Sequence, residues 1–407
     1  MGKRVLILIE GASNMRLYVQ AARRLGLHPI ILSANPGQYD HLAAEAIEAI
    51  RVDTENLDAL IAECSRLRTT YDISGITSAV ESTYTTVGKL CRHFGLPGPN
   101  PGSIERCCNK FEQREFLAKA GVPVPSYRLA ENAAEVESSA AEIGLPVVVK
   151  PAVGSGSVGV RLCCTADEIA QHLTYLLGGM HMWRTSPRIL VEEFVQGQQY
   201  TAQIMGDEII GIEAAHLHPP PRFVFRQWVF PAPVTSNQRE HIAEVSQKCL
   251  RALDLGWGPT NIELRWTRRG PVVVEVNPRM PGWPDPQLVQ QAYGVDLVAE
   301  HIKLVIGDQW DLRSRHSKVA AARNLVPDSD GILDWITGGS QAAAVPGVTE
   351  VKLYGEPKMP IVRKGDYRDC LGYVIAATLS LPETEAALQR AVKMIDWSIV
   401  PLQIERE

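Results

Sequence analysis

The sequence lacks the features that mark several large classes of protein. Its first apolar run, residues 5–9, ends at Glu10 and is too short for a signal-peptide core or a membrane span. With 41 Lys and Arg against 46 Asp and Glu, the net charge of -5 offers no general attraction to nucleic acid or anionic lipid. The eight cysteines form no C-x-x-C pattern, so we expect reduced packing residues and no zinc knuckle or redox motif. These absences predict a cytoplasmic protein that binds neither nucleic acid nor membrane.

The order of the apolar runs divides the 407 residues, 45% of them hydrophobic, into three parts. Up to residue 105, short β-branched runs alternate with helical stretches, which predicts a doubly wound α/β unit with a parallel sheet. A helical stretch at 107–120 precedes a region rich in strands, as in an α+β body with antiparallel sheets. The last hundred residues combine strands with an amphipathic helix at 383–394. We therefore predict domains at 1–105, 106–310 and 311–407.

A glycine-rich segment carries the strongest local signal. Lys150 ends an apolar strand, and residues 154–159 satisfy G-x-G-x-x-G. A dinucleotide fingerprint would have to open a helix, whereas residues 160–164 have the pattern of a strand. The segment is therefore predicted to form a hairpin flap, in which backbone N–H groups, Ser155 and Ser157 donate to nucleotide phosphates beside Lys150. On the loop alone, an ordinary flexible hairpin explains the pattern equally well.

A second segment is an apolar strand that ends in two acids, Glu192 and Glu193. Such a strand end can present a carboxylate and backbone groups to the edge of an adenine ring. A solvated strand end explains two glutamates equally well, so this segment alone decides nothing.

A third segment places polar groups on one face of a hairpin. Period-two alternation puts Glu275, Asn277 and Arg279 on the same side, and Glu263 on the preceding strand can oppose them. Carboxylates and an amide suit Mg²⁺, which takes one or two carboxylates and completes its shell with water and phosphate oxygens. Without other evidence, a cross-strand Glu–Arg network would be the commoner explanation.

In this order, these segments resemble the ATP-grasp superfamily of carboxylate–amine ligases, over residues 107–307 for the catalytic part. The flap, Val-Glu-Glu-Phe-Val, Ile-Glu-Leu-Arg and Glu-Val-Asn-Pro-Arg are short one by one, but their joint occurrence at these separations is specific. Within the superfamily the chain is similar to the L-amino acid ligases of the alanine–anticapsin ligase kind. The resemblance implies a Rossmann-like pre-ATP-grasp domain at 1–105, a two-subdomain ATP-grasp body at 106–310 and a C-terminal α+β domain at 311–407.

The resemblance also assigns roles in nucleotide binding, residue by residue. Lys110 and Lys150 match the two lysines that contact the phosphates of ATP. Glu192 matches the acid that binds the adenine amino group. The matched flap and hinge residues are Gly154, Ser155, Gly156, Ser157 and Val158, followed by Glu193, Phe194 and Val195.

On the chemical side of the site, Glu263 and Glu275 match the Mg²⁺ ligands, with Asn277 as a third. Arg279 matches the arginine beside the acyl phosphate, where its planar fork can hold carboxylate and phosphoryl oxygens. Arg279, Lys150 and Ser157 form the expected catalytic set.

Trp283 follows Arg279 by four residues, beyond Gly282. It resembles the tryptophan that caps the pocket of the first amino acid in dipeptide ligases, where a bulky ring would favour Ala, Gly or Ser. The alternative is a core aromatic beside a proline-rich turn.

Two segments depart from the family pattern. Gln199 stands where relatives carry a glutamate that binds the ribose hydroxyls, although an amide can still hydrogen-bond a hydroxyl. In the loop at 222–231, relatives tend to show a Glu and a His, where this chain has Phe225, Arg226 and Trp228. We include Arg226 and Trp228 among the candidate substrate-binding residues. Arg222 and Arg226 could pair with an acidic or phosphorylated substrate, or be surface charges.

The resemblance implies an ATP-dependent ligase that joins two amino acids, or an amino acid and an amine, through an acyl phosphate. Its cofactors would be ATP and Mg²⁺, with two ions expected and Mn²⁺ as a substitute; its partners would be amino acid substrates and a second copy in a homodimer. One alternative is an ATP-grasp ligase on a non-amino-acid carboxylate, of the purine-pathway or D-alanine ligase type. Another is a nucleotide-binding protein whose site has decayed, which the retained charges argue against. The sequence gives neither the substrates nor their order.

Overall fold

The computed structural model describes residues 2–11, 14–39, 42, 45–178 and 188–401. Within them the strands form four sheets, and the first is parallel with the order β3-β2-β1-β4. Its elements are β1 (Lys3–Ile9), α1 (Met15–Arg24), β2 (His28–Ser33), β3 (Glu48–Arg51), α3 (Leu57–Arg68), β4 (Tyr71–Thr77) and α4 (Glu81–Phe94). The predicted parallel α/β unit is confirmed.

Two helices connect this unit to the rest, α5 (Pro101–Cys108) and α6 (Lys110–Lys119). The prediction of one continuous helix over 107–120 was wrong. Asn109 has extended backbone geometry, and its side chain accepts hydrogen bonds from the N–H groups of Phe111 and Glu112. Asn109 therefore caps the N-terminus of α6, which places Lys110 in the first turn.

A small antiparallel sheet follows with the order β5-β8-β6-β7. It comprises β5 (Tyr127–Ala130), β6 (Val147–Pro151), β7 (Arg161–Cys163) and β8 (Ile189–Glu193), with α7 (Ala133–Ile143) and α8 (Ala166–Gly178). Strands β6 and β7 pair directly, with Val147 opposite Cys163. The glycine-rich segment thus joins two strands of a hairpin, as predicted, and opens no helix.

The largest sheet has eight antiparallel strands in the order β13-β12-β9-β10-β11-β14-β18-β16. Its strands are β9 (Gln198–Met205), β10 (Glu208–Leu217), β11 (Phe225–Phe230), β12 (Pro259–Thr267), β13 (Gly270–Asn277), β14 (Val319–Leu325), β16 (Val348–Leu353) and β18 (Gly372–Thr378). Residues 225–230 are therefore a central strand, whereas the sequence predicted a loop. Pairing on both sides and burial of residues 227–230 outweigh the flanking arginine and proline.

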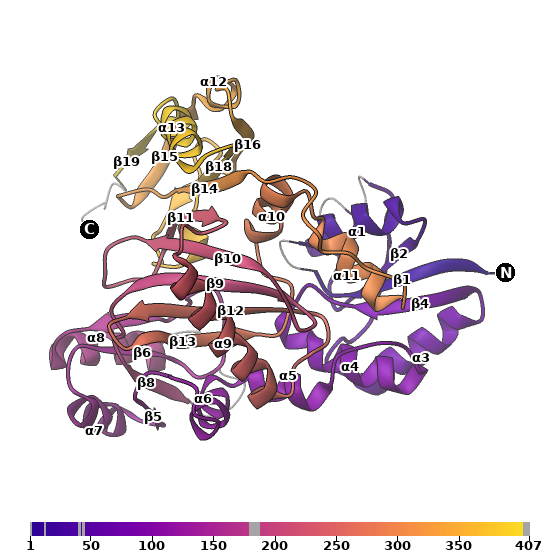
Figure 1. Cartoon of the computed structure of the whole chain (residues 1–407), viewed down its shortest axis with the longest axis horizontal. Helices are drawn as coiled ribbons and strands as arrows, with labels where there is room; N and C mark the ends of the chain where they lie inside the picture. The colour runs from indigo at the N-terminus through magenta and orange to yellow at the C-terminus, as the bar shows by residue number, and fades with distance from the viewer. Residues whose placement is uncertain (1, 12–13, 40–41, 43–44, 179–187, 402–407) are drawn as a thin grey trace, which may run out of the picture.

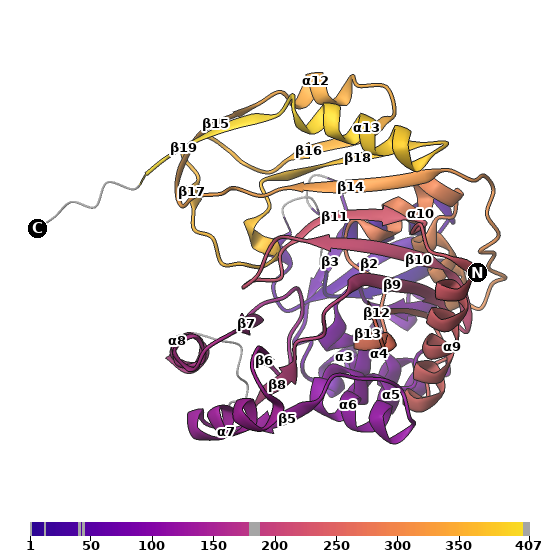
Figure 2. The same cartoon turned by 60° about the vertical axis from the view of Figure 1, so that its left-hand side comes forward.

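The C-terminal strands β14, β18 and β16 continue this sheet, as Figures 1 and 2 show. The fourth sheet consists of β15 (Gly331–Thr337), β17 (Pro360–Ile361) and β19 (Asp396–Val400). The other α-helices are α9 (Ser236–Leu253), α10 (Asp285–Tyr293), α11 (Leu297–Val305), α12 (Gly339–Ala343) and α13 (Leu381–Val392). The domain boundaries remain a prediction.

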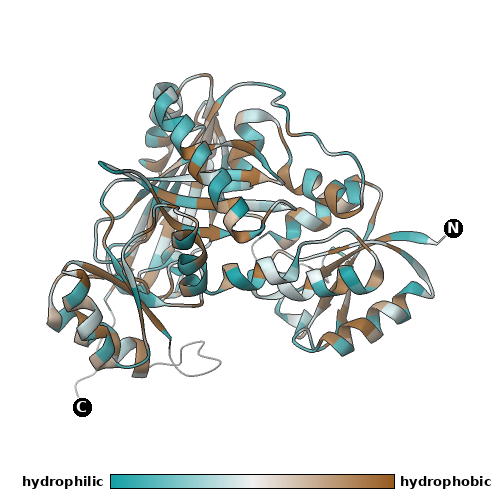
Figure 3. Cartoon of the chain, turned by 60° about the horizontal axis from the view of Figure 1, so that its bottom comes forward, coloured by the Kyte–Doolittle hydropathy of each residue, from teal (hydrophilic) through white to brown (hydrophobic). Residues whose placement is uncertain are grey.

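One hydrophobic cluster joins α1, α10 and α11 to one face of the large sheet. A second cluster lies on the opposite face, under α9 and α13. Hydrophobic residues gather along the strands, and many helices are hydrophilic on their outer side (Figure 3). Among the described residues, no helix is long and apolar enough to cross a membrane.

Candidate active site

A pocket lies between the small sheet with its flap and the β9–β12–β13 end of the large sheet. Residues from both sheets line it. The predicted site residues among its lining are Lys110, Lys150, Gly154, Ser155, Gly156, Ser157, Val158, Glu192, Glu193, Phe194, Val195, Gln199, Glu263 and Glu275. Folding therefore brings the predicted phosphate, adenine and metal segments to one cavity.

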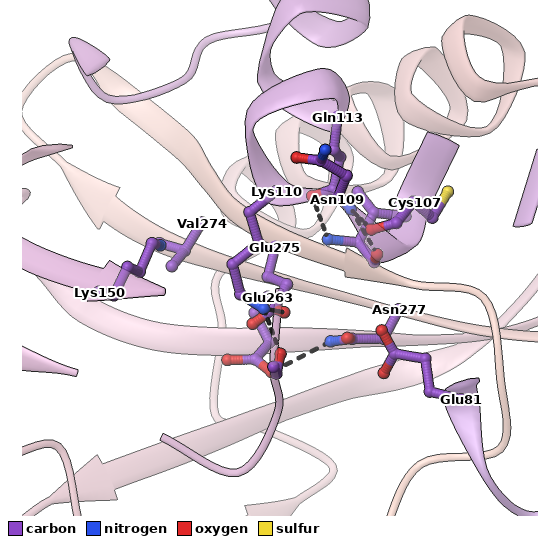
Figure 4. Close-up of polar contacts among 12 residues, drawn as sticks. Glu81, Cys107, Asn109, Lys110, Gln113, Lys150, Glu263, Val274, Glu275 and Asn277 are labelled. Carbon is purple, nitrogen blue, oxygen red and sulfur yellow. Dashed lines mark hydrogen bonds and ion pairs between the residues drawn. The ribbon is translucent and has the colours of Figure 1, made fainter. Parts of the chain in front are cut away.

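Two acids face each other across the hairpin of β12 and β13. Glu263 is directly opposite Glu275, and Lys110 Nζ lies 2.9 Å from Glu275 Oε1 (Figure 4). Burial, together with the neighbouring Glu275, raises the pKa of Glu263 to about 7. Burial would also raise the pKa of Glu275, but Lys110 and Lys150 outweigh it and lower that pKa. Lys110 thus pairs with Glu275, whereas no lysine or arginine of the described residues forms an ion pair with Glu263, and Arg279 and Lys110 act on it only from farther away.

This arrangement fits a divalent cation. Two buried carboxylates repel each other unless a positive charge lies between them, and Mg²⁺ requires only one or two carboxylates beside phosphate oxygens and water. Asn277 joins them through its Nδ2, which donates to Asn261 Oδ1 (3.1 Å) and Glu263 Oε1 (3.4 Å). In the described parts of the chain, no three His, Cys, Asp or Glu side chains group closely enough to hold a metal by themselves.

A buried charge triad supports the small sheet beside this pair. Glu192 Oε1 accepts from Arg114 Nε at 2.7 Å, and Glu192 Oε2 pairs with Lys150 Nζ. Burial would raise the pKa of Glu192, but the two cations outweigh it and lower that pKa. The sequence expected this carboxylate at an adenine amino group, and the structure gives it two cationic partners instead.

The sequence analysis did not identify Arg114 as a site residue. The spacing of four residues from Lys110 could have indicated it, because this spacing puts both cations on one face of α6. Its guanidinium also donates to the carbonyl of Val274 on β13, so it ties the small sheet to the large one.

The far end of the pocket is aromatic. The rings of Phe194 and Phe223 lie 6.3 Å apart, and the Arg265 guanidinium lies 5.7 Å from the centroid of Phe194. Gln199 links this end to the acids, because its Nε2 donates to Glu263 Oε2 at 3.0 Å and its Oε1 accepts from Arg265. Apolar rings beside polar groups suit a nucleobase and its ribose.

The flap closes the pocket from above the sheets. Gly156 has φ +66, and a Cβ placed there would come within 2.6 Å of the Tyr367 ring, so glycine is required both by conformation and by space. Lys110 Nζ donates to the carbonyl of Gly154. The flap therefore contacts both the phosphate-side lysine and the C-terminal part of the chain.

Arg279 connects the site to the N-terminal unit. Its Nε lies 2.8 Å from Glu81 Oε2, at the start of α4. Burial would lower the pKa of Arg279, but Glu81 and Glu275 outweigh it and raise that pKa. The sequence analysis did not identify Glu81. This residue follows the carboxyl end of β4, and ligand sites of α/β sheets lie at that edge.

Trp283 lies against aromatic neighbours beside the pocket. Its ring centroid is 3.8 Å from that of Tyr373 and 5.8 Å from that of Trp228. The structure thus unites Trp228 with Trp283, and Gly282 has open space where a side chain would lie. Arg226 is exposed. The predicted site residues that do not line the pocket are Arg226, Trp228, Asn277, Arg279, Gly282 and Trp283.

Comparison with known proteins agrees with this architecture. Residues 19–98 match the ATP-grasp N-terminal domain, residues 143–286 the ATP-grasp domain, and residues 323–400 the L-amino acid ligase C-terminal domain 2. The chain belongs to the ATP-grasp ligases. Members of this family form carbon–nitrogen bonds with release of ADP, and they use ATP and Mg²⁺.

The relatives of this ATP-grasp ligase include both amino acid and purine-pathway enzymes. The chain is 62% identical over 400 residues to the uncharacterized protein y4rH of Sinorhizobium fredii, covering 98% of this chain and 84% of that protein. It is 27% identical over 338 residues to carnosine synthase 1 of Mus musculus, covering 76% of this chain but only 40% of that enzyme. It is 23% identical over 424 residues to the formate-dependent phosphoribosylglycinamide formyltransferase of Sulfurisphaera tokodaii, covering 97% of each.

The fold is also seen in solved structures. The L-amino acid ligase from Bacillus licheniformis superposes with a TM-score of 0.82 at 18% identity, covering 98% of this chain and 99% of that one. This likeness concerns the fold.

Proposed function

We propose that this ligase joins an amino acid with a small side chain to the amine of a second amino acid. One observation supports the proposal most directly: Lys110 pairs with Glu275, Glu263 faces Glu275 across the hairpin, and both acids act on Arg279, which precedes the aromatic Trp283 by four residues. Such a set suits acyl transfer from an activated carboxylate and contains no nucleophile or acid–base dyad. The match of residues 323–400 to an L-amino acid ligase domain favours an amino acid as substrate.

The reaction has two steps. A carboxylate oxygen of the first substrate attacks the γ-phosphorus of ATP, and the bond between that phosphorus and the β–γ bridging oxygen breaks to release ADP. The nitrogen of the second substrate then attacks the acyl carbon; phosphate leaves, and the nitrogen loses a proton. The protein contributes position and charge neutralisation.

The roles of the residues follow from their places. Lys110, Lys150 and Ser157 of the flap line the pocket, and in this proposal they would donate to phosphate oxygens. Arg279 offers its guanidinium to the carboxylate being activated. Glu263 and Glu275 would hold Mg²⁺, with Asn277 as a third ligand after rotation of its amide; the ion would neutralise charge on the phosphates.

The flap would exclude water from the acyl phosphate, which water would otherwise hydrolyse in competition with the amine. Further parts of the proposal are two Mg²⁺ ions with Mn²⁺ as a substitute, a homodimer, a cytoplasmic location and the three domains at 1–105, 106–310 and 311–407.

The test is phosphate release by the purified protein with Mg²⁺ and ATP against pairs of L-amino acids, with mass spectrometry of the products. We expect turnover only with pairs that contain glycine, alanine or serine, and a product mass equal to the two amino acids minus water. Turnover with amine-free carboxylates alone would instead support a purine-pathway type of substrate, and binding of ATP with no turnover would support a decayed site.

A further inference from the structure

A second group of acids lies on the same face of the large sheet, beyond the proposed metal ligands. Strand pairing places Glu275 opposite Glu263, Glu263 opposite Thr201, and Thr201 opposite Glu213. Residues in register share a face, so the Glu213 side chain points to the same side as the metal pair. With neighbouring strands about 4.8 Å apart, its Cα lies roughly 10 Å from that of Glu263.

Glu213 is buried without compensation. Its side chain is 1% exposed, and its Oε2 has no hydrogen-bond partner among the residues that the structure describes. A buried carboxylate oxygen that lacks a donor is costly, so the site implies a donor that arrives with a ligand.

A second carboxylate completes the group. Asp285 Oδ2 accepts from Gln203 Nε2 at 2.7 Å, and Gln203 is two residues from Thr201 on β9, hence on the same face. Burial raises the pKa of Asp285 to about 7, and burial together with Asp285 and Glu263 raises that of Glu213. In the part of the chain that the structure describes, neither acid forms an ion pair, although Arg279 acts on Asp285 from farther away.

The surroundings indicate which cation. Asp285 comes two residues after Trp283, so the loop that carries the proposed side-chain cap leads directly into the first turn of α10, which carries the carboxylate. Trp228, which packs against Trp283, is opposite Ala215, two residues along β10 from Glu213, so its ring lies on the same face as the acid. Carboxylates beside an aromatic ring suit a primary ammonium, which has three donors to distribute and no need for the octahedral oxygen shell of Mg²⁺.

We propose that Glu213 and Asp285 bind the ammonium group of the amino acid whose carboxylate is activated beside Arg279. This inference rests on the proposed ligase function and adds its specificity: the activated acid must carry an amine. The two residues are positioning residues that bind substrate and leave the phosphoryl chemistry to the metal pair and lysines.

The experiment measures activation separately from amide formation. With hydroxylamine as acceptor, the acyl phosphate is trapped as a hydroxamate, so the second substrate is not needed. Wild type, Glu213→Gln, Asp285→Asn and the control Glu208→Gln, which is exposed on the same strand, are assayed with glycine, L-alanine and L-serine and with propanoate, the amine-free analogue of alanine.

We expect Glu213→Gln and Asp285→Asn each to raise the KM for L-alanine by about 10- to 100-fold, the usual loss for a hydrogen bond to a charged group. The preference for L-alanine over propanoate should fall by the same factor, while the KM values for ATP and Mg²⁺ stay unchanged. Glu208→Gln should behave as wild type. Glu213→Gln should melt no lower than wild type, because it removes a buried carboxylate whose Oε2 has no partner in the described structure. Asp285→Asn should melt close to wild type, because the amide oxygen can still accept from Gln203.

An unchanged preference in both variants, with an active wild type, would overturn the inference and leave the ligase function intact. A rise in the KM for Mg²⁺ in place of L-alanine would overturn it in favour of a metal role, and equal losses for alanine and propanoate with a lower melting temperature would overturn it in favour of a structural role. A wild type that makes no hydroxamate from any of the three amino acids would defeat the ligase proposal itself.

Discussion

Replacement of Glu192 by alanine should destabilise the protein far more than the same change at its neighbour Glu193. The Glu192 side chain is 3% exposed and lies between Arg114 at 0% and Lys150 at 5%. Removal of one partner from a buried ion pair costs about 3 to 5 kcal/mol, because the remaining charges stay buried without compensation. Here two cations would be left beside each other.

The control is matched by position along the strand. Glu193 is 31% exposed and pairs with Arg269, itself 60% exposed, at 2.6 Å. Exposed pairs of this kind contribute about 0 to 1 kcal/mol. Alanine at Glu193 should therefore have a small effect, even though the geometry of the pair is good.

The assay is thermal and urea unfolding followed by circular dichroism. For a cooperative unit of 150–250 residues, each kcal/mol moves the melting temperature by about 2 to 4 °C, so Glu192→Ala should lower it by roughly 6 to 20 °C and Glu193→Ala by less than about 4 °C. Since Arg114 and Lys150 lower the pKa of Glu192 below 4.5, the full effect should be present at neutral pH and fade only as the pH falls through that lower value. Equal shifts for the two variants at pH 7 would refute the argument.

Three further predictions follow from single side chains. In Mg²⁺-free buffer the free energy of unfolding should fall as the pH rises from about 5 to 7 and level off above, because the pKa of Glu263 rises from 4.5 to about 7 on folding. The fall should be smaller in Glu263→Gln. A free energy of unfolding that increases across this range would contradict the prediction. Trp283→Ala, which removes the ring packed on Tyr373, should admit larger amino acids and lower kcat/KM for alanine by about 10- to 200-fold, as read from product masses; an unchanged substrate range would place the ring outside the pocket. Gly156→Ala should raise the KM for ATP and slow turnover, because the new Cβ meets the Tyr367 ring and the backbone is left-handed; wild-type kinetics would show that the flap tolerates both.

The sequence predicted the parts of the site that local patterns encode. Period-two alternation places Glu275 and Asn277 on one face, but the turn that pairs Thr267 with Gly270 would by itself set Glu263 opposite Val274, and a bulge after Glu263 shifts the register so that it faces Glu275. The flap could be distinguished from a dinucleotide loop because a strand pattern, and no helix, follows Gly159. In both cases the information lies within about fifteen residues of chain.

Other residues of the site depend on pairing between distant segments. Glu213 lies in a strand whose apolar pattern predicts only a β-structure, and it reaches the site because β10 pairs with β9 in one register. Glu81 meets Arg279 across 198 residues, and Arg114 meets Glu192 across 78. Strand β11 was mistaken for a loop because its arginine and the following proline outweigh its alternation until two neighbouring strands bury it.

The carboxylates on this face of the large sheet are costly to bury in a hydrophobic core, but they suit a surface that binds positively charged ligands. Glu275 has Lys110 as a partner, whereas Glu263, Asp285 and Glu213 have raised pKa values and no ion-pair partner among the residues that the structure describes. Each lacks a positive charge that the proposed reaction supplies: Mg²⁺ at the first, a substrate ammonium at the other two. Because ligands that bind the folded state alone stabilise it in proportion to the logarithm of their concentration, the complex with Mg²⁺, nucleotide and amino acid should be much more stable than the free protein. In the free protein these carboxyls take up protons near neutral pH, as their raised pKa values indicate, whereas the proposed ligands would supply the neutralising charge instead. The cost of these acids in the free protein and the specificity of the site thus have the same physical origin.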